Sequence, residues 1–134
     1  MSDFIPQLHI EDVNRVSSVG LAHVGDAVYE LLVRSRLCAQ GHLAAQDLHR
    51  STVAYVKAPA QAEAAERLLP LLTEEERAVF RRARNAKLHA SPQGASVGEY
   101  HAATGLEALF GWLWLLGRTE RAAELFDAAV EGES

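Results

Sequence analysis

The sequence predicts an all-α fold. Apolar residues recur at three- and four-residue spacing along most of the 134-residue chain, and no stretch alternates strictly between apolar and polar residues over the length of a strand. Hydrophobic residues make up 49% of the chain and charged residues 23%, a balance typical of a folded globular protein. At this length we expect one domain, residues 1–134, built around a single core.

The first long helix is expected over about residues 19–37. Its apolar residues form one stripe, and the turn signal Gln40-Gly41 follows it. The stripe consists of Leu21, Val24, Val28, Leu31 and Leu32. A second helix is expected over about residues 45–56.

The middle of the chain predicts two more helices. An Ala-rich helix is expected over about residues 59–72, with a proline in its first turn, where proline is tolerated. A second proline, Pro70, should end or distort it. Thr73, followed three residues later by Glu76, has the pattern of a capping box, so the next helix should start there and reach about Lys87.

The last part of the chain predicts a loop and two helices. Residues 88–98 have loop composition, and we expect them to form a mobile binding loop. A helix over about residues 99–116 should end at Gly117 in the C′ position. Thr119 can cap a last helix that ends near Gly132.

Residues 109–116 form a segment that is apolar on every side. A helix of this kind must be covered on every side, either by the centre of the monomer's own core or by a second copy of the chain. Because so short a chain has few other helices, we expect a homodimer whose interface includes part of residues 105–116.

The chain has features of a cytoplasmic protein. Its first residues contain acids and a proline where a signal peptide needs a basic start and an apolar run, and no segment is apolar enough to span a membrane. The single Cys38 can form neither an internal disulfide nor a thiolate metal site. The histidines show no zinc-site spacing and no serine has the surroundings of a catalytic nucleophile, which argues against zinc enzymes and serine hydrolases.

Net charge argues against a nucleic-acid binder, but its distribution does not. The net charge is −5, whereas phosphate contacts draw on Lys and Arg. However, residues 81–87 contain four of the chain's 13 basic residues: Arg81, Arg82, Arg84 and Lys87. With Asn85, this basic cluster could hold phosphates or ribose hydroxyls, although basic residues are also favoured at a helix C-terminus by its dipole.

Two segments contain acids that could hold a hard cation. Asp26 and Glu30 are four residues apart and share one face of the first long helix. Glu107 stands in the polar gap of an otherwise apolar helix, where a carboxylate needs a partner. Mg²⁺ needs only one or two protein carboxylates when substrate phosphates complete its coordination. The alternatives are a solvated face for the first pair and a salt bridge from Glu107 to Arg118 or Arg121.

Gly25, beside Asp26, predicts close packing. A glycine inside a helix costs roughly 1 kcal/mol relative to alanine. We therefore expect another part of the chain to approach the helix closely at this position.

These acidic segments resemble those of the ribonuclease III family. Residues 21–30, LAHVGDAVYE, resemble the family's signature segment with its G-D-A, and residues 104–115, TGLEALFGWLWL, resemble its second acidic segment. The order and separation agree, and RRARNAK lies just upstream of the second segment. The resemblance covers about residues 17–130 and is greatest to the mini-ribonuclease III branch, the short bacterial branch that lacks the double-stranded-RNA-binding domain.

The resemblance assigns roles to particular residues. It implies that Asp26 and Glu107 are catalytic and bind the metal, Mg²⁺, with Glu30 supporting the site from the second shell. The chain departs from the longer enzymes of the family at Ala22 and Thr104, where those enzymes have acids. The residues expected to contact RNA are Arg81, Arg84, Asn85, Lys87 and Thr104.

The resemblance also implies a function. It implies a ribonuclease III-type endonuclease domain, a helical bundle that forms a homodimer and cleaves double-stranded RNA with Mg²⁺, each subunit cutting one strand. The implied process is the maturation of precursor ribosomal RNA of the 23S type, with a ribosomal protein as a candidate partner that presents the RNA.

Two alternatives remain open at this point. One is an all-α, Mg²⁺-dependent nucleotide pyrophosphohydrolase, for which Glu63 and Glu66 offer an i, i+3 acid pair. The other is a non-catalytic helical RNA-binding or ribosome-assembly factor, which the missing acids at Ala22 and Thr104 favour.

Overall fold

The all-α prediction is confirmed. The computed structural model describes residues 7–86 and 95–131, and within these ranges it contains helices and no strand. The elements are α1 (Ile10–Val13), α2 (Ser18–Ala39), α3 (Ala45–Val56), α4 (Ala58–Leu68), the 3₁₀ turn η1 (Leu69–Leu71), α5 (Glu74–Arg84), α6 (Val97–Leu115) and α7 (Thr119–Val130). None of the described helices is both long and apolar enough to cross a membrane.

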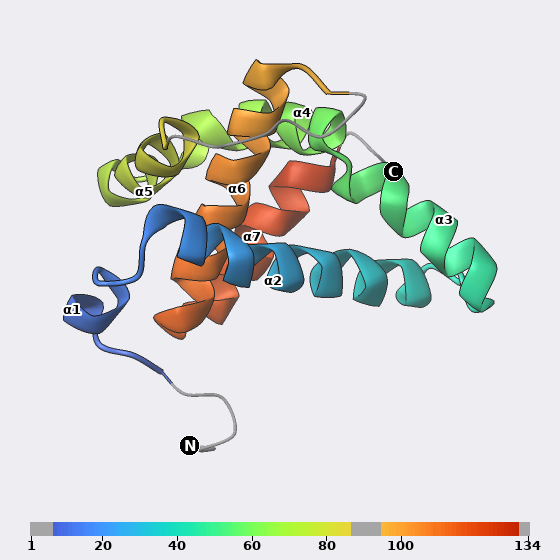
Figure 1. Cartoon of the computed structure of the whole chain (residues 1–134). Helices are drawn as coiled ribbons and strands as arrows, with labels where there is room; N and C mark the ends of the chain where they lie inside the picture. The colour runs from blue at the N-terminus through green and yellow to red at the C-terminus, as the bar shows by residue number, and fades with distance from the viewer. Residues whose placement is uncertain (1–6, 87–94, 132–134) are drawn as a thin grey trace.

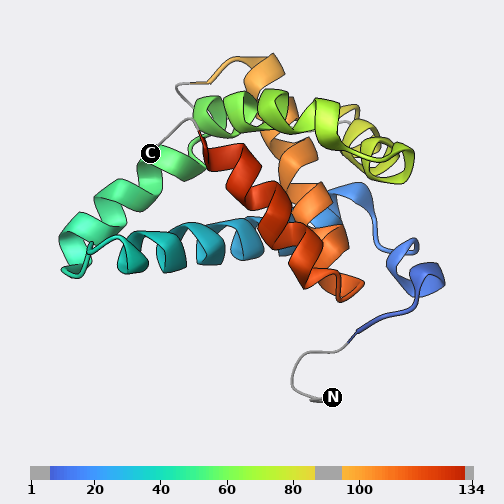
Figure 2. The ribbon, with the colours of Figure 1, turned by 180° about the vertical axis from the view of Figure 1, so that it is seen from behind.

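Helix α6 lies at the centre of the fold. It crosses α2 and contacts α4, α5 and α7 as well (Figure 1). Seen from behind, α7 covers the bundle on the side opposite α2 (Figure 2). The most completely buried side chains of α6 are Leu106, Leu109, Phe110, Trp112 and Leu113, none of them more than 1% exposed.

This burial corrects one reason for expecting a dimer. The all-round apolar segment of α6 does not need a second copy of the chain, because four neighbouring helices of the same monomer cover it. Only Trp114 and Leu115, near the end of the helix, are half-buried. Within residues 105–116, burial by the monomer leaves mainly Trp114 and Leu115 available to a partner, and the expected dimer interface there stays a prediction.

The backbones of α2 and α6 touch where they cross. A Cβ atom added to Gly25 would lie 1.5 Å from the carbonyl oxygen of Glu107, and one added to Gly111 would lie 2.1 Å from the carbonyl oxygen of Leu21. Only glycine fits at these two positions, since any side chain would push the helices apart. The close packing expected at Gly25 is confirmed, and it places the α2 residues around Asp26 directly against α6.

Most expected boundaries lie within a few residues of the observed ones. Helix α3 has the expected bounds, and α4 ends before Pro70, which lies in η1. At the start of α5 the capping box is formed: Glu76 N donates to Thr73 Oγ1 at 3.1 Å, and Thr73 N donates to Glu76 Oε1 at 2.9 Å.

The start of α6 differs from the expectation. The helix begins two residues early because Ser96 and Glu99 form a second capping box, with bonds of 3.0 and 2.9 Å. Positions 97 and 98, expected in a loop, are therefore helical. Of the expected binding loop over 88–98, residues 88–94 lie outside the described residues.

The end of α6 follows the expectation, but the start of α7 does not. Gly117 follows α6 with a φ of +77°, as expected for the C′ position. The N-cap position of α7 is Arg118, which makes no side-chain capping bond, and Thr119 is the first helical residue. The capping role expected for Thr119 is therefore wrong.

Candidate active site

Asp26 and Glu107 meet at one pocket. Asp26 lies on α2 and Glu107 on α6, and both line a pocket of about 200 Å³. The other lining residues come from the same two helices: Val19, Ala22, His23, Tyr100 and Thr104. Because glycine at position 25 lets α2 touch the backbone of Glu107, two acids far apart in the chain become neighbours.

The two carboxyl groups interact directly. Burial is the largest cause that raises the pKa of Glu107, and the hydrogen bond and negative charge of Asp26 raise it further, to about 8. The side chain of Gln61 on α4 has a smaller effect in the opposite direction. At pH 7 and without a cation, Glu107 is therefore mostly protonated.

This pair has the chemistry of a site for a hard divalent cation. A cation would favour ionisation of Glu107 and would offset the repulsion between two neighbouring carboxylates. Among residues 7–86 and 95–131 there is no group of three or more His, Cys, Asp or Glu side chains that could hold a metal. A metal at this pocket would depend on Asp26 and Glu107, and Mg²⁺ accepts such a reduced set when water and phosphate oxygens complete its coordination.

Glu30 does not join the pair. Its Oε2 lies 3.2 Å from Nη2 of Arg34, one turn further along α2, and it is not among the residues that line the pocket. Both side chains of this ion pair are exposed, at 39% for Glu30 and 52% for Arg34. The structure therefore gives Glu30 a surface partner, and its supporting role stays a prediction.

The alternative partners of Glu107 are engaged elsewhere. Arg121 donates from Nε and Nη2 to the two carboxylate oxygens of Glu76, at 2.9 and 2.8 Å. Arg118 donates from Nη1 to Oε1 of Glu75 at 3.2 Å. These hydrogen bonds connect α7 and its N-cap residue to the start of α5. A salt bridge from Glu107 to either arginine is therefore excluded.

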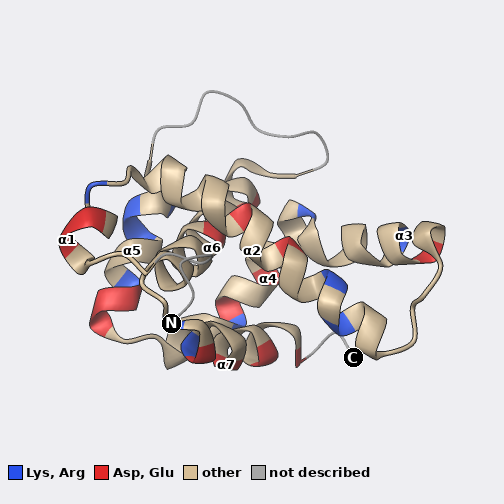
Figure 3. Ribbon diagram, turned by 90° about the horizontal axis from the view of Figure 1, so that it is seen from below, with Lys and Arg blue, Asp and Glu red and all other residues tan. Residues whose placement is uncertain are grey.

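The basic cluster lies at the C-terminal end of α5. Acidic and basic residues occupy opposite ends of this helix (Figure 3). Arg81 is exposed, while Arg84 donates from Nε to Oδ1 of Asn85 at 3.4 Å and lies 5.7 Å from the ring centroid of Phe80. Lys87 lies outside the described residues. Neither Arg81, Arg84 nor Asn85 lines the pocket of the carboxyl pair.

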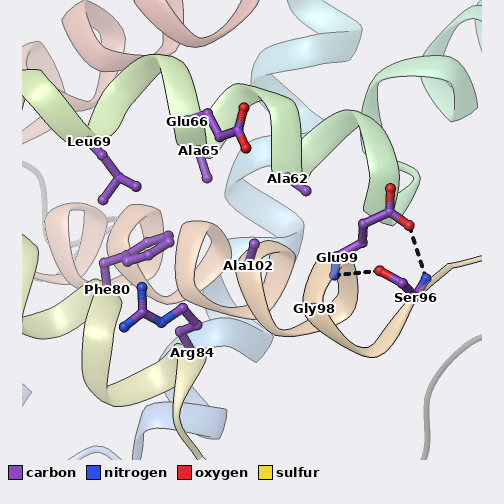
Figure 4. A pocket seen from close by; sticks show the side chains of 10 residues that line it. All are labelled: Ala62, Ala65, Glu66, Leu69, Phe80, Arg84, Ser96, Gly98, Glu99 and Ala102. Atoms are coloured by element: carbon purple, nitrogen blue, oxygen red, sulfur yellow. Dashed lines mark hydrogen bonds between the residues drawn. The ribbon is translucent and has the colours of Figure 1, made fainter.

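Arg84 lines a different pocket, of about 400 Å³, between α4, α5 and α6. Figure 4 shows its guanidinium beside Phe80 on one wall, with Glu66 of α4 on the facing wall. At the far end, Ser96 and Glu99 form the reciprocal bonds of their capping box. The polar groups at that end of the pocket are thus satisfied by the helix start.

Thr104 does lie beside the carboxyl pair. It is 5% exposed, lines the same pocket, and its hydroxyl donates to the carbonyl oxygen of Tyr100 at 3.0 Å. The structure thus separates the residues expected to contact RNA. Thr104 lies at the carboxyl pair, and the described part of the basic cluster lies at the end of α5.

Sequence reasoning missed three residues at the site. His23 and Tyr100 line the pocket, three residues before Asp26 and seven before Glu107, so helical spacing from the two acids could have found them. Gln61 influences Glu107 from α4. Nothing in its spacing relates it to either acid, because its position depends on how α4 packs on α6.

Known proteins share both the sequence and the fold. The profile of the ribonuclease III domain family matches residues 20–118. Mini-ribonuclease 3 of Symbiobacterium thermophilum is 50% identical over 111 residues, which cover 83% of this chain and 85% of that protein. Mini-ribonuclease 3 of a Thermoanaerobacter species is 45% identical over 121 residues, covering 90% and 85%.

The structural comparison agrees with the sequence comparison. The crystal structure of a protein from Fusobacterium nucleatum superposes with a TM-score of 0.81 at 31% sequence identity, over 92% of this chain and 98% of that one. The family profile covers both acidic segments up to the end of α6. On this match, and on relatives of up to 50% identity, the chain belongs to the ribonuclease III domain family.

Proposed function

We propose that this ribonuclease III-type endoribonuclease cleaves double-stranded RNA in a Mg²⁺-dependent reaction, with the ion held by Asp26 and Glu107. The observation that carries the proposal is the carboxyl pair: two acids from different helices share one pocket, where burial and the neighbouring Asp26 raise the pKa of Glu107 to about 8. The relatives named Mini-ribonuclease 3 support the same reaction class.

The chain's own residues position the reaction. Asp26 and Glu107 would hold the Mg²⁺, which would supply an activated water and neutralise charge on the phosphate. Asp26 presents its carboxylate from the exposed face of α2, while Glu107 lies half-buried on α6, so the two helices hold the pair between them. Thr104 forms the wall beside them, where it contacts the strand that is cut.

RNA is held mainly by its backbone. We propose that Arg81, Arg84, Asn85 and Lys87 contact phosphates and ribose hydroxyls, because double-stranded RNA is recognised by shape, phosphate and 2′-hydroxyl contacts rather than by base edges. The exposure of Arg81 and Asn85 at the end of α5 supports this assignment. Sequence preference should be weak for such contacts.

The proposed biological form is a homodimer acting on precursor ribosomal RNA of the 23S type, with a ribosomal protein as a candidate partner that presents the RNA. A dimer provides one carboxyl pair for each strand of a duplex. Since the apolar residues of α6 from Leu106 to Leu113 are buried inside the monomer, the interface would use the half-buried end of α6 or other surfaces. Val19, which is 48% exposed at the rim of the pocket, is an apolar side chain that a partner could cover.

The activity is tested directly with purified protein. Duplex RNA should be cleaved in Mg²⁺, whereas neither single-stranded RNA in Mg²⁺ nor duplex RNA with a chelator should be. A nucleoside triphosphate should stay intact, because the pyrophosphohydrolase alternative depends on Glu63 and Glu66, which are exposed on α4 and form no metal cluster within the described chain. Metal-independent cleavage, or hydrolysis of the nucleotide alone, would contradict the proposal.

A further inference from the structure

Gln61 is a buried polar residue whose donor is left unsatisfied. It lies on α4, which packs against α6, and is only 2% exposed. Its backbone N–H is part of the helix and donates to the carbonyl oxygen of Lys57 at 3.0 Å. Its side-chain Nε2, by contrast, is buried and has no hydrogen-bond partner. Among the described residues, the only other buried side-chain polar atom without a hydrogen-bond partner is Nε1 of Trp112.

A buried amide without a partner is unfavourable for folding. A methionine or leucine would fill the same space between α4 and α6 without leaving an N–H group unsatisfied. The surroundings support this comparison, because the neighbouring buried residues of α4 are apolar: Ala64, Ala65 and Leu68. Packing therefore does not explain why a glutamine stands here. Its N–H donor suggests a hydrogen-bond partner that is used when the site is occupied.

The available partner is the carboxyl group of Glu107. The side chain of Gln61 interacts with it, in the direction that favours the ionised form. A carboxylate that holds a cation is a strong acceptor, because hydrogen bonds to a charged group are shorter and stronger than neutral ones.

We propose that Gln61 is a positioning residue: its Nε2 donates a hydrogen bond to the Glu107 carboxylate when a divalent cation lies between Glu107 and Asp26. The bond would fix the orientation of the carboxylate, so that one oxygen faces the cation and the other faces α4. Gln61 does not line the pocket, and so it acts through Glu107 without contact to RNA. The inference rests on the metal site of the proposed function and adds to it a third helix, α4.

The test replaces the donor and keeps the volume. In Gln61→Met and Gln61→Leu the amide is replaced by an apolar group of similar size. Thr52→Val is the matched control, because Thr52 is also 2% exposed and its hydroxyl donates only within α3, to the carbonyl oxygen of Leu48 at 2.7 Å. Mn²⁺ serves as the probe, and its binding to each full-length protein without RNA is measured by electron paramagnetic resonance.

A positioning role and a packing role predict different results. If Gln61 orients Glu107, the Gln61 variants should bind Mn²⁺ roughly 10–100-fold more weakly than wild type, as is typical when a group that orients a metal ligand is removed. Their Tm without metal should be unchanged or higher, because an unsatisfied buried donor has been removed. In cleavage, the Mg²⁺ concentration for half-maximal rate should rise more than the rate at saturating Mg²⁺ falls. Thr52→Val should bind Mn²⁺ as wild type does.

Failure of this inference is separable from failure of the proposed function. Wild-type Mn²⁺ affinity in both Gln61 variants, together with weakened binding in Asp26→Asn, would overturn the role of Gln61 alone. If wild type and Asp26→Asn bind Mn²⁺ equally, the metal site itself is wrong and the role of Gln61 is wrong with it.

Discussion

Asp26 and Glu107 differ in their surroundings although they share a pocket. Glu107 is half-buried among the fully buried residues of α6, and Asp26 is exposed on α2. Burial and the neighbouring Asp26 therefore raise the pKa of Glu107 to about 8, so Glu107 is mostly protonated at neutral pH. Binding of a divalent cation must displace this proton, so metal affinity should increase as pH rises toward 8.

The first prediction concerns stability in the absence of metal. The pKa of Glu107 is higher in the folded state, about 8, than its ordinary value of 4.5, so above pH 4.5 the folded state holds a proton that the unfolded state has lost. The contribution of this group to stability is thus greatest below pH 4.5, and it declines as pH rises to about 8. Glu107→Gln should remove this decline.

Chemical denaturation at a series of pH values, in chelator, measures this difference between wild type and variant. Comparison with Glu99→Gln controls for the loss of one carboxylate on the same helix, since Glu99 belongs to the capping box at the start of α6. Parallel pH profiles for wild type and Glu107→Gln would show that Glu107 is ionised in the folded protein at neutral pH and that its pKa is not raised.

At the scale of the elements, the crossing of α2 and α6 positions the site. Helix α6 has little amphipathic pattern because neighbouring helices cover it on several sides, and α2 approaches it so closely that only glycine fits at positions 25 and 111. The carboxyl pair depends on this crossing, since the two acids come from the two helices that touch.

The second prediction tests that crossing. Gly25→Ala should destabilise the protein by about 3 kcal/mol or more, because the added methyl group overlaps the carbonyl oxygen of Glu107, 1.5 Å away, and the helices must separate. The cleavage rate should fall by more than the loss of folded protein explains, because Asp26 moves with α2. Gly98→Ala is the control: its added Cβ would be 4.0 Å from the nearest atom, and it should stabilise the protein by up to roughly 1 kcal/mol. Equal thermal stability of Gly25→Ala and wild type would contradict the close crossing.

Helix boundaries were predictable from the sequence where local signals were unambiguous. The capping box of Thr73 and Glu76 and the C′ glycine Gly117 each determine one helix end through nearby residues, and both are formed. The start of α6 was missed because the loop composition of the preceding residues outweighed the Ser96–Glu99 capping box. Helix α1 was not predicted, because its four residues are too few to show periodicity.

The site could be predicted only in part, for a physical reason. Asp26 and Glu107 were identified because resemblance to the ribonuclease III family relates two segments that are distant in the chain. Gln61 belongs to a third segment whose relation to Glu107 depends on the packing of α4 against α6, and packing geometry has no signal in local spacing. The covering of residues 105–113 was misjudged for the same reason, since the number of helices around α6 is a property of the tertiary fold.

At the scale of the whole molecule, a net charge of −5 coexists with a basic helix end. The third prediction is that Arg81→Ala and Arg84→Ala each weaken binding to duplex RNA and reduce the slope of log affinity against log salt by about 1, because each removes one phosphate contact. Arg15→Ala, which removes an exposed charge outside the cluster, should leave the slope unchanged. The affinity of each protein for duplex RNA is measured in chelator over a range of salt concentrations. If all three variants have the same salt dependence of RNA affinity, the RNA binds to another surface of the protein.

The central claim is that Asp26 and Glu107 form the metal site of an endoribonuclease, and one substitution tests it most directly. Asp26→Asn keeps the size of the side chain but removes the charge that holds the cation, so RNA cleavage in Mg²⁺ should collapse. Because Asp26 is exposed, Tm should change little, and affinity for duplex RNA should be retained or increased through relief of like-charge repulsion. Asp12→Asn, on the exposed side of α1, is the matched control and should cleave at the wild-type rate. The decisive measurement is the single-turnover rate of duplex cleavage at saturating protein in the same Mg²⁺. A rate for Asp26→Asn below that of the control by orders of magnitude, with RNA binding intact, is the result predicted here, whereas cleavage at the wild-type rate would show that the acid pair is structural.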